Sequence, residues 1–165
     1  MAEWTTSTKA KARPEQVLEV LTDPDAIRRW SPIDFDVEDL DGSRLSAGST
    51  ARVSGKLAGV RVGFDVEVHA ADEAGVELTA HGPIGFDVRY DLVPAGAGSD
   101  VTASISLRRG GGITGRVLSK ATAALLSAGA LDGAAQGIAR AAEEERSAPR
   151  RPSRAPVRGP ALAAA

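Results

Sequence analysis

Residues 113–146 read ITGRVLSKATAALLSAGALDGAAQGIARAAEEER, and this stretch decides the fold. Apolar residues recur in it at steps of three and four, which places them on one face of a helix at 100° per residue. They are Ile113, Val117, Ala121, Ala124, Ala128, Leu131, Ala135, Ile138 and Ala142. The spacing predicts one long amphipathic helix of about 50 Å. A helix of this length needs another surface to cover its apolar face.

Strands precede this helix. Runs that alternate apolar and polar residues are separated by short turns such as Asp41-Gly42, Ala58-Gly59 and Gly82-Pro83, which predict antiparallel hairpins. One further run opens the chain, and two short helical stretches follow it, with Pro14 and Asp23-Pro24 as start signals. The predicted strands are 4–12, 33–40, 49–57, 60–70, 75–81, 84–93 and 100–108.

This order predicts an α+β domain over residues 1–146. We expect a curved antiparallel sheet of about seven strands around the long C-terminal helix, with two short helices after the first strand. Each strand has one apolar and one polar side, so the sheet has one face for the helix and one for water. Residues 147–165 are basic and Pro-rich with few large apolar groups, and we predict a disordered tail.

The charge distribution argues against nucleic-acid binding. All 22 acidic residues lie at or before Glu145, together with 15 of the 20 basic residues, so the body carries a net charge of −7. An acidic body is a poor surface for phosphates. The basic tail suits an acidic partner or anionic lipid, or is simply solvated.

No cysteine is present, which excludes disulfides and thiolate chemistry. The N-terminal residues lack the apolar core of a signal peptide, and we expect a cytoplasmic protein. A membrane span is not expected, because Ala and Gly dominate the helical segment and Asp132 and Gln136 interrupt it.

The element order, together with ARPEQVLEVLTDPDAIRRW at residues 12–30 and the glycine segment 110–115, resembles the START-like helix-grip superfamily (SRPBCC). That superfamily includes bacterial aromatic polyketide cyclases and dehydrases. The glycine-rich hairpins and the helix entry also resemble the subgroup named after an accessory subunit of carbon monoxide dehydrogenase. The resemblance covers residues 1–146 and implies an apolar cavity between sheet and helix, used for lipids, polyketides or related ligands.

We name as cavity-lining candidates Trp30, Phe35, Phe64, Phe86, Tyr90, Leu131 and Asp132. Tyr90 is the only ionisable residue on the predicted inner face of the sheet, so it is the best single catalytic candidate, although a buried tyrosine commonly only satisfies its hydroxyl. Asp132 either anchors a ligand at the cavity or lies in water at the helix border. Each aromatic residue is either cavity wall or ordinary core.

Neither a metal nor a cofactor is expected. His69 and His81 fall on the outward side of their strands and lack the spacing of metal ligands. The segment GGGITGRV at residues 110–117 resembles a phosphate-binding loop only in part, because Arg116 and Val117 replace the required lysine and hydroxyl residue.

Three functions remain open. The chain binds a hydrophobic small molecule and acts on it as a polyketide cyclase or dehydrase, carries a lipid without changing it, or serves as an accessory or assembly protein like the carbon monoxide dehydrogenase subgroup. Whether it is an enzyme is therefore undecided. Gly129, Gly133 and Gly137 recur at steps of four, a spacing of small residues that lets backbones approach closely, and this suggests a homodimer as one further possibility.

Overall fold

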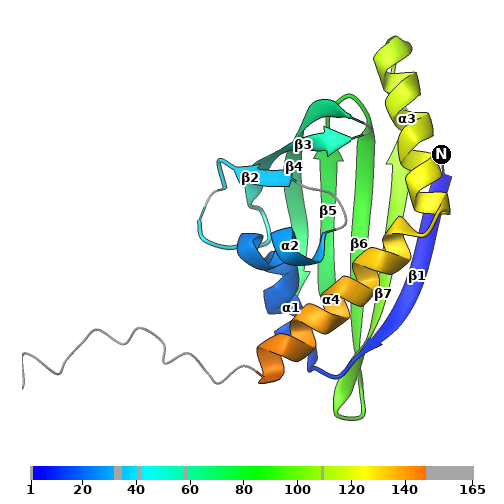
Figure 1. Ribbon diagram of the computed structural model, residues 1–165. Helices are drawn as coiled ribbons and strands as arrows, with labels where there is room; N and C mark the ends of the chain where they lie inside the picture. Colours follow the sequence, from blue (N-terminus) through cyan, green and yellow to red (C-terminus); the bar gives the residue numbers. More distant parts are fainter. Residues whose placement is uncertain (1, 32–34, 41, 58, 109, 148–165) are drawn as a thin grey trace, which may run out of the picture.

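The computed structural model describes residues 2–31, 35–40, 42–57, 59–108 and 110–147 (Figure 1). Seven strands and four helices follow one another in these residues. The elements are β1 (Ala2–Ala10), α1 (Pro14–Thr22), α2 (Pro24–Trp30), β2 (Phe35–Glu38), β3 (Thr50–Leu57), β4 (Val60–Asp72), β5 (Gly75–His81), β6 (Gly85–Ala95), β7 (Gly98–Arg108), α3 (Gly112–Ser127) and α4 (Ala130–Ser147). The predicted disordered tail falls mainly on residues 148–165, outside the described residues.

All seven strands form one antiparallel sheet in the order β1-β7-β6-β5-β4-β3-β2. From β2 to β7, each strand pairs with the next strand along the chain. Strand β1 pairs with β7 and forms one edge of the sheet. The predicted helix-grip architecture is thereby confirmed. The sheet curves around the helices, which lie on its concave side (Figure 1).

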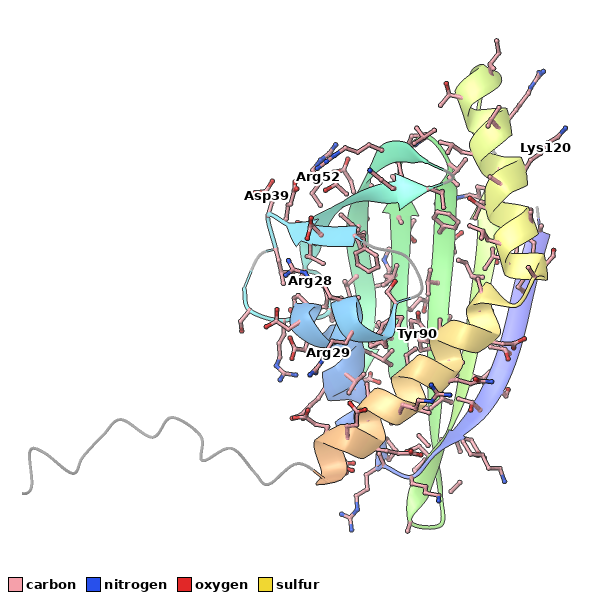
Figure 2. All side chains as sticks on the ribbon, viewed as in Figure 1. Arg28, Arg29, Asp39, Arg52, Tyr90 and Lys120 are labelled. Carbon is pink, nitrogen blue, oxygen red and sulfur yellow. The ribbon has the colours of Figure 1, made fainter. Side chains whose placement is uncertain are left out.

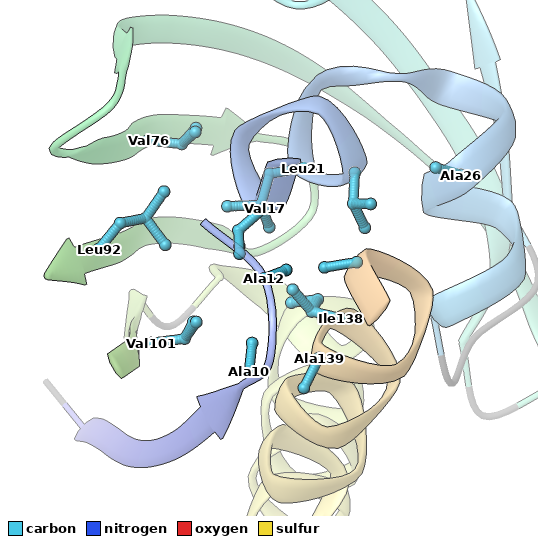
Figure 3. Close-up of a cluster of buried hydrophobic side chains, with 12 residues drawn as sticks. Ala10, Ala12, Val17, Leu21, Ala26, Val76, Leu92, Val101, Ile138 and Ala139 are labelled. Carbon is cyan, nitrogen blue, oxygen red and sulfur yellow. The ribbon is translucent and has the colours of Figure 1, made fainter. Parts of the chain in front are cut away.

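The inner face of the sheet is apolar, as the alternation predicted. On β7, Val101, Ala103 and Leu107 are nearly inaccessible, whereas the residues between them are only half-buried. Helix α1 places Val17 and Leu21 against this face, and Ile138 of α4 completes the same cluster (Figure 3). Pro14 opens α1, and the Asp23 side chain accepts a hydrogen bond from the Asp25 amide to open α2.

The prediction of one long C-terminal helix is wrong. The helix is interrupted at Ala128–Gly129, and α3 and α4 run in different directions (Figure 1). Gly129 adopts a φ of 104°, a left-handed conformation that favours glycine and that commonly ends helices. The Gly129 amide bonds the Leu126 carbonyl, and the Gly129 carbonyl then accepts from the Gly133 amide in the first turn of α4. A glycine in an alanine-rich segment therefore changes the direction of the chain.

The predicted apolar stripe is correct for α4 and wrong for α3. Leu131, Ala135, Ile138 and Ala142 are buried in α4. In α3, Ile113 is 83% exposed and Val117 is 54% exposed. The buried residues of α3 are instead Gly115, Leu118, Ser119 and Thr122, on the opposite side of that helix.

The three glycines at steps of four do not form one ridge. Gly129 lies at the break between the helices. A Cβ on Gly137 would meet the Trp30 carbonyl oxygen at 2.9 Å, so Gly137 packs against α2 inside the molecule. Only the surroundings of Gly133 are open, with no atom within 4 Å of such a Cβ. The three glycines therefore offer no shared surface for a homodimer.

Candidate ligand cavity

An apolar cavity lies between the inner face of the sheet and the helices. Its volume is about 290 Å³, and side chains from α1, α2, the central strands and α4 line it. We call it the first lobe. Residues that line this lobe and not the adjoining one include Leu21, Ile27, Trp30, Leu45, Val76, Tyr90 and Leu131.

A second lobe of about 230 Å³ adjoins it toward α3 and the β3–β4 hairpin. Phe64 and Phe86 line this lobe with their ring centroids 5.5 Å apart, and Leu57 and Thr122 line it with them. The two lobes share a set of lining residues and therefore lie side by side. The shared residues include Phe35, Val53, Ala80, Val88, Ile105 and Leu126.

Trp30 is fixed at the wall of the first lobe by a polar and an aromatic contact. Its indole Nε1 donates a hydrogen bond to the Val20 carbonyl at 3.0 Å. Its ring stands edge-on to Tyr90, with centroids 6.3 Å apart and an interplanar angle of 80°. The indole is thereby oriented by α1 on one side and by the sheet on the other.

Tyr90 and Ser31 are the polar side chains that line the first lobe, and Tyr90 is the ionisable one. It comes from the middle of β6, between Val76 of β5 and Ala103 of β7, whose small side chains leave room around the ring. Within the described part of the chain its hydroxyl has no hydrogen-bond partner. Burial raises the pKa of Tyr90 to about 12, so at neutral pH the hydroxyl stays protonated. It can donate a hydrogen bond to a ligand oxygen but cannot serve as a base there.

Six of the seven candidates named from the sequence line the two lobes. Trp30, Tyr90 and Leu131 line the first lobe, Phe64 and Phe86 line the second, and Phe35 lines both. Asp132 lines neither lobe. This carboxylate is exposed and accepts a hydrogen bond from the Thr6 hydroxyl on β1. One residue along a helix is a rotation of 100°, which takes the side chain from the cavity at Leu131 to the outer edge at Asp132.

Thr122 was missed from the sequence. It is 5% exposed, lines the second lobe, and its hydroxyl has no partner among the described residues. The signal that could have found it is the spacing of Leu118, Thr122 and Leu126, which repeats every four residues. That pattern was overlooked because an alanine stripe at the same period competed with it.

The cavity lining is almost free of charge. Among the described residues, Tyr90 and Lys56 are the only lining residues with ionisable side chains, and Lys56 also borders an outer depression with Arg28, Arg61 and Asp36. Within the described ranges, no cluster of three or more His, Cys, Asp or Glu residues could hold a metal ion. In the same part of the chain, no helix is both long and apolar enough to span a membrane.

A helix-grip fold with an apolar cavity of this kind defines a class of hydrophobic-ligand-binding proteins. The family model described as "Polyketide cyclase / dehydrase and lipid transport" matches residues 1–143, and the chain belongs to this family. The resemblance inferred from the sequence is thus confirmed. A search of the curated proteins finds no significant match.

Solved structures share the fold at low sequence identity. TTHA0849 from Thermus thermophilus superposes with a TM-score of 0.65 at 18% identity, covering 86% of this chain and 97% of that one. Ara h 8.0201 superposes with a TM-score of 0.58 at 15% identity, covering 89% and 99%. DynU16, from the dynemicin biosynthetic locus, has a TM-score of 0.50 at 16% identity, covering 81% of this chain and 46% of that chain. These likenesses show the fold alone.

Proposed function

We propose that the chain binds a hydrophobic small molecule, a lipid or a polyketide-like compound, in the two lobes between sheet and helices. The observation that carries the proposal is a pair of adjoining apolar lobes, the first lined by the Tyr90 hydroxyl, which has no hydrogen-bond partner among the described residues. Binding sites for small ligands commonly combine a mainly apolar lining with a few polar groups that set orientation. The preferred ligand is an apolar skeleton with a carbonyl or hydroxyl oxygen placed to accept from Tyr90.

Binding without conversion is the better supported form of this function. The described residues of the lining include no carboxylate or imidazole. Tyrosine is protonated at neutral pH, and burial raises the pKa of Tyr90 still further above it. General acid–base catalysis needs a titratable group near the operating pH within reach of the substrate. A carrier requires only the apolar surface and one orienting hydrogen bond.

A cyclase or dehydrase is the second candidate, favoured by the same hydroxyl. The CH₂ groups between two ketones are acidic, so a poly-ketone can form an enolate without a protein base. A hydrogen bond from Tyr90 to the enolate oxygen would stabilise that charge. The curved cavity would bring the enolate carbon to a distant carbonyl, a carbon–carbon bond would form, and loss of water would follow.

Native mass spectrometry of the purified chain tests binding directly, since a tightly held apolar ligand co-purifies. A displacement assay with an apolar fluorophore extends it to chosen lipids and poly-ketones. Ala80→Phe places a ring where the lobes meet, because Ala80 lines both, and should abolish binding while the chain stays folded. Ala97→Phe, at an exposed position in the β6–β7 turn, is the matched control and should bind normally.

Two results separate the candidates. A poly-ketone that loses one water in the presence of the chain, and not with Tyr90→Phe, indicates a cyclase or dehydrase. A bound compound recovered unchanged indicates a carrier. If the fluorophore binds neither the native chain nor Ala97→Phe, and no ligand co-purifies, the proposal is wrong.

A further inference from the structure

Exposed apolar side chains gather at one end of the molecule. Five large hydrophobic residues are exposed in the described part of the chain, and only Val93 lies at the other end of the sheet. The remaining four are Val60 (42%), Ile113 (83%), Val117 (54%) and Leu125 (41%). They belong to α3 and to the start of β4, which meet where Leu118 packs with Leu57 and Val62.

Helix α3 has two different faces. On a wheel of 100° per residue, Ile113, Val117 and Ala124 fall together, and Arg116 and Lys120 flank them. The buried residues Leu118, Ser119 and Thr122 lie on the opposite side. The first turns of α3 extend past the end of the sheet, and Lys120 points away from it (Figures 1 and 2). The outer face is therefore apolar at its centre and basic at its edge, with no described element covering it.

The elements that carry this apolar surface also carry four basic side chains, Lys56 and Arg61 on the β3–β4 hairpin and Arg116 and Lys120 on α3. Lys56 and Arg61 stand directly opposite each other on β3 and β4, an arrangement of like charges that destabilises a strand pair, and Asp36, which pairs with Arg28, borders the same outer depression. None of the four basic side chains on the hairpin and α3 forms an ion pair within the described residues. Between Arg108 and Asp132 the sequence contains no acidic residue, although the body as a whole is acidic.

From this arrangement we propose that the docking end, defined as Val60, Ile113 and Val117 with Lys56, Arg61, Arg116 and Lys120, binds the surface of an anionic lipid bilayer. Short apolar side chains on a basic helix face suit the boundary between head groups and acyl chains. The cations attract anionic lipid, and each one adds to the affinity as it nears the surface. A second copy of the chain would fit poorly, because it would bring the same cations face to face.

Docking would also place the cavity beside the membrane. Leu125 is 41% exposed and at the same time lines the second lobe, and Thr122 lines that lobe from the same helix. An apolar ligand could then pass between bilayer and cavity with little exposure to water. This last step rests on the proposed function, whereas docking itself does not.

Co-sedimentation of the full chain with vesicles tests the proposal. Vesicles of phosphatidylcholine alone are compared with vesicles that also contain phosphatidylglycerol. Val117→Asp should sediment much less than the native chain with the anionic vesicles. Val93→Asp is the matched control, because Val93 is 56% exposed and Val117 is 54% exposed, and it should leave sedimentation unchanged. The basic residues 146–158 are present in every variant, so their contribution cancels.

A second pair of variants tests the charges. Arg116→Gln with Lys120→Gln should weaken partitioning by about fivefold for each cation lost, with the difference removed at high salt. Arg140→Gln, an exposed arginine on α4, is the control. Fluorophore binding to the cavity should be unaffected in all these variants, which separates failure to dock from failure of the cavity.

Three results would overturn the proposal. They are equal sedimentation of Val117→Asp and the native chain, equal binding to both kinds of vesicle, and a concentration-dependent dimer in light scattering that Val117→Asp dissolves. The last result would identify a second copy of the chain as the occupant of this surface.

Discussion

The indole of Trp30 stands at 80° to the phenol ring of Tyr90, so α2 and β6 meet at the wall of the first lobe through one edge-to-face contact. Edge-to-face pairs contribute about 1 kcal/mol beyond the area that they bury. The contact orients the phenol ring that bears the unpartnered hydroxyl, and the Nε1 of the same indole is tied to α1.

Trp30→Phe tests this attachment. The variant keeps an aromatic ring beside Tyr90 but removes the Nε1 donor that bonds the Val20 carbonyl. We expect a loss of about 1–2 kcal/mol in the free energy of unfolding, measured by urea denaturation, since a part-buried carbonyl is left without its partner. Unchanged stability would mean that water replaces the indole donor at no cost.

Tyr90→Phe should separate the contribution of the Tyr90 hydrogen bond to ligand binding from the contribution of apolar contact. The variant should bind a pure hydrocarbon probe as tightly as the native chain does. A ligand with a ketone oxygen should bind about tenfold less tightly, the equivalent of one hydrogen bond of about 1.4 kcal/mol. Displacement titrations with a matched pair of probes measure both. Equal losses for the two probes would contradict an orienting role.

The stability of the chain should fall in strongly alkaline solution. The pKa of Tyr90 is about 12 in the folded chain because of burial, compared with 10.0 for an unperturbed tyrosine. Below pH 10 both states hold the proton, so this group costs nothing. Between pH 10 and 12 the unfolded state releases the proton and the folded state keeps it, which destabilises the fold by up to about 3 kcal/mol.

The measurement is unusually clean, because Tyr90 is the only tyrosine in the sequence. Its ionisation can be followed by absorbance, and the urea midpoint can be compared at pH 9 and at higher pH for the native chain and Tyr90→Phe. The variant should lose less stability over this range. Parallel losses would show that other groups govern the alkaline transition.

Gly137→Ala should destabilise the chain, whereas Gly133→Ala should stabilise it. A methyl group at Gly137 meets the Trp30 carbonyl oxygen at 2.9 Å, and the α2–α4 contact must shift. At Gly133 nothing lies within 4 Å, so the gain is the helix propensity of alanine over glycine, about 1 kcal/mol. Thermal unfolding of the two variants decides the point, and a stabilising Gly137→Ala would show that α4 is not held close to α2.

Thr122→Val should stabilise the empty chain by about 1 kcal/mol, because it removes a buried hydroxyl that has no partner among the described residues. Ser119→Ala, one turn earlier in α3, should have the opposite effect. The Ser119 hydroxyl donates to the Gly115 carbonyl at 2.7 Å and accepts from the Gly110 amide at 3.3 Å. Urea denaturation compares the two variants, and equal effects would rule out the difference in hydrogen bonding as their cause.

The sheet could be predicted from the sequence because its pattern has a period of two. Most inward residues alternate with polar neighbours, so the side of Tyr90 followed from its place between Arg89 and Asp91. The bounds of β5 were predicted to the residue. The inner and outer faces of β6 and β7 were likewise correct.

The C-terminal helices could not be predicted as well, because alanine fits either face of a helix. In α3 the stripe through Ala121 and Ala124 competes with the one through Leu118 and Thr122. Side-chain size would have favoured the stripe through Leu118 and Thr122, since a buried leucine removes more apolar area from water than an alanine does. The sequence left two positions open for Asp132, the cavity or the helix border, because a side chain beside a buried stripe can turn either inward or outward and only tertiary contacts decide.

The break at Gly129 divides the helical segment that covers the sheet into two helices that differ in local stability. Helix α4 packs on β1, α1 and α2 and contributes Ile138 to the largest buried cluster, whereas α3 buries Leu118 and three small or polar residues. Opening of α3 therefore exposes much less apolar surface than opening of α4 does. Amide hydrogens of α3 should exchange with solvent well before those of α4, because exchange follows the free energy of local opening. In a single unbroken helix the two halves would share one hydrogen-bond ladder, so their rates of exchange would differ less.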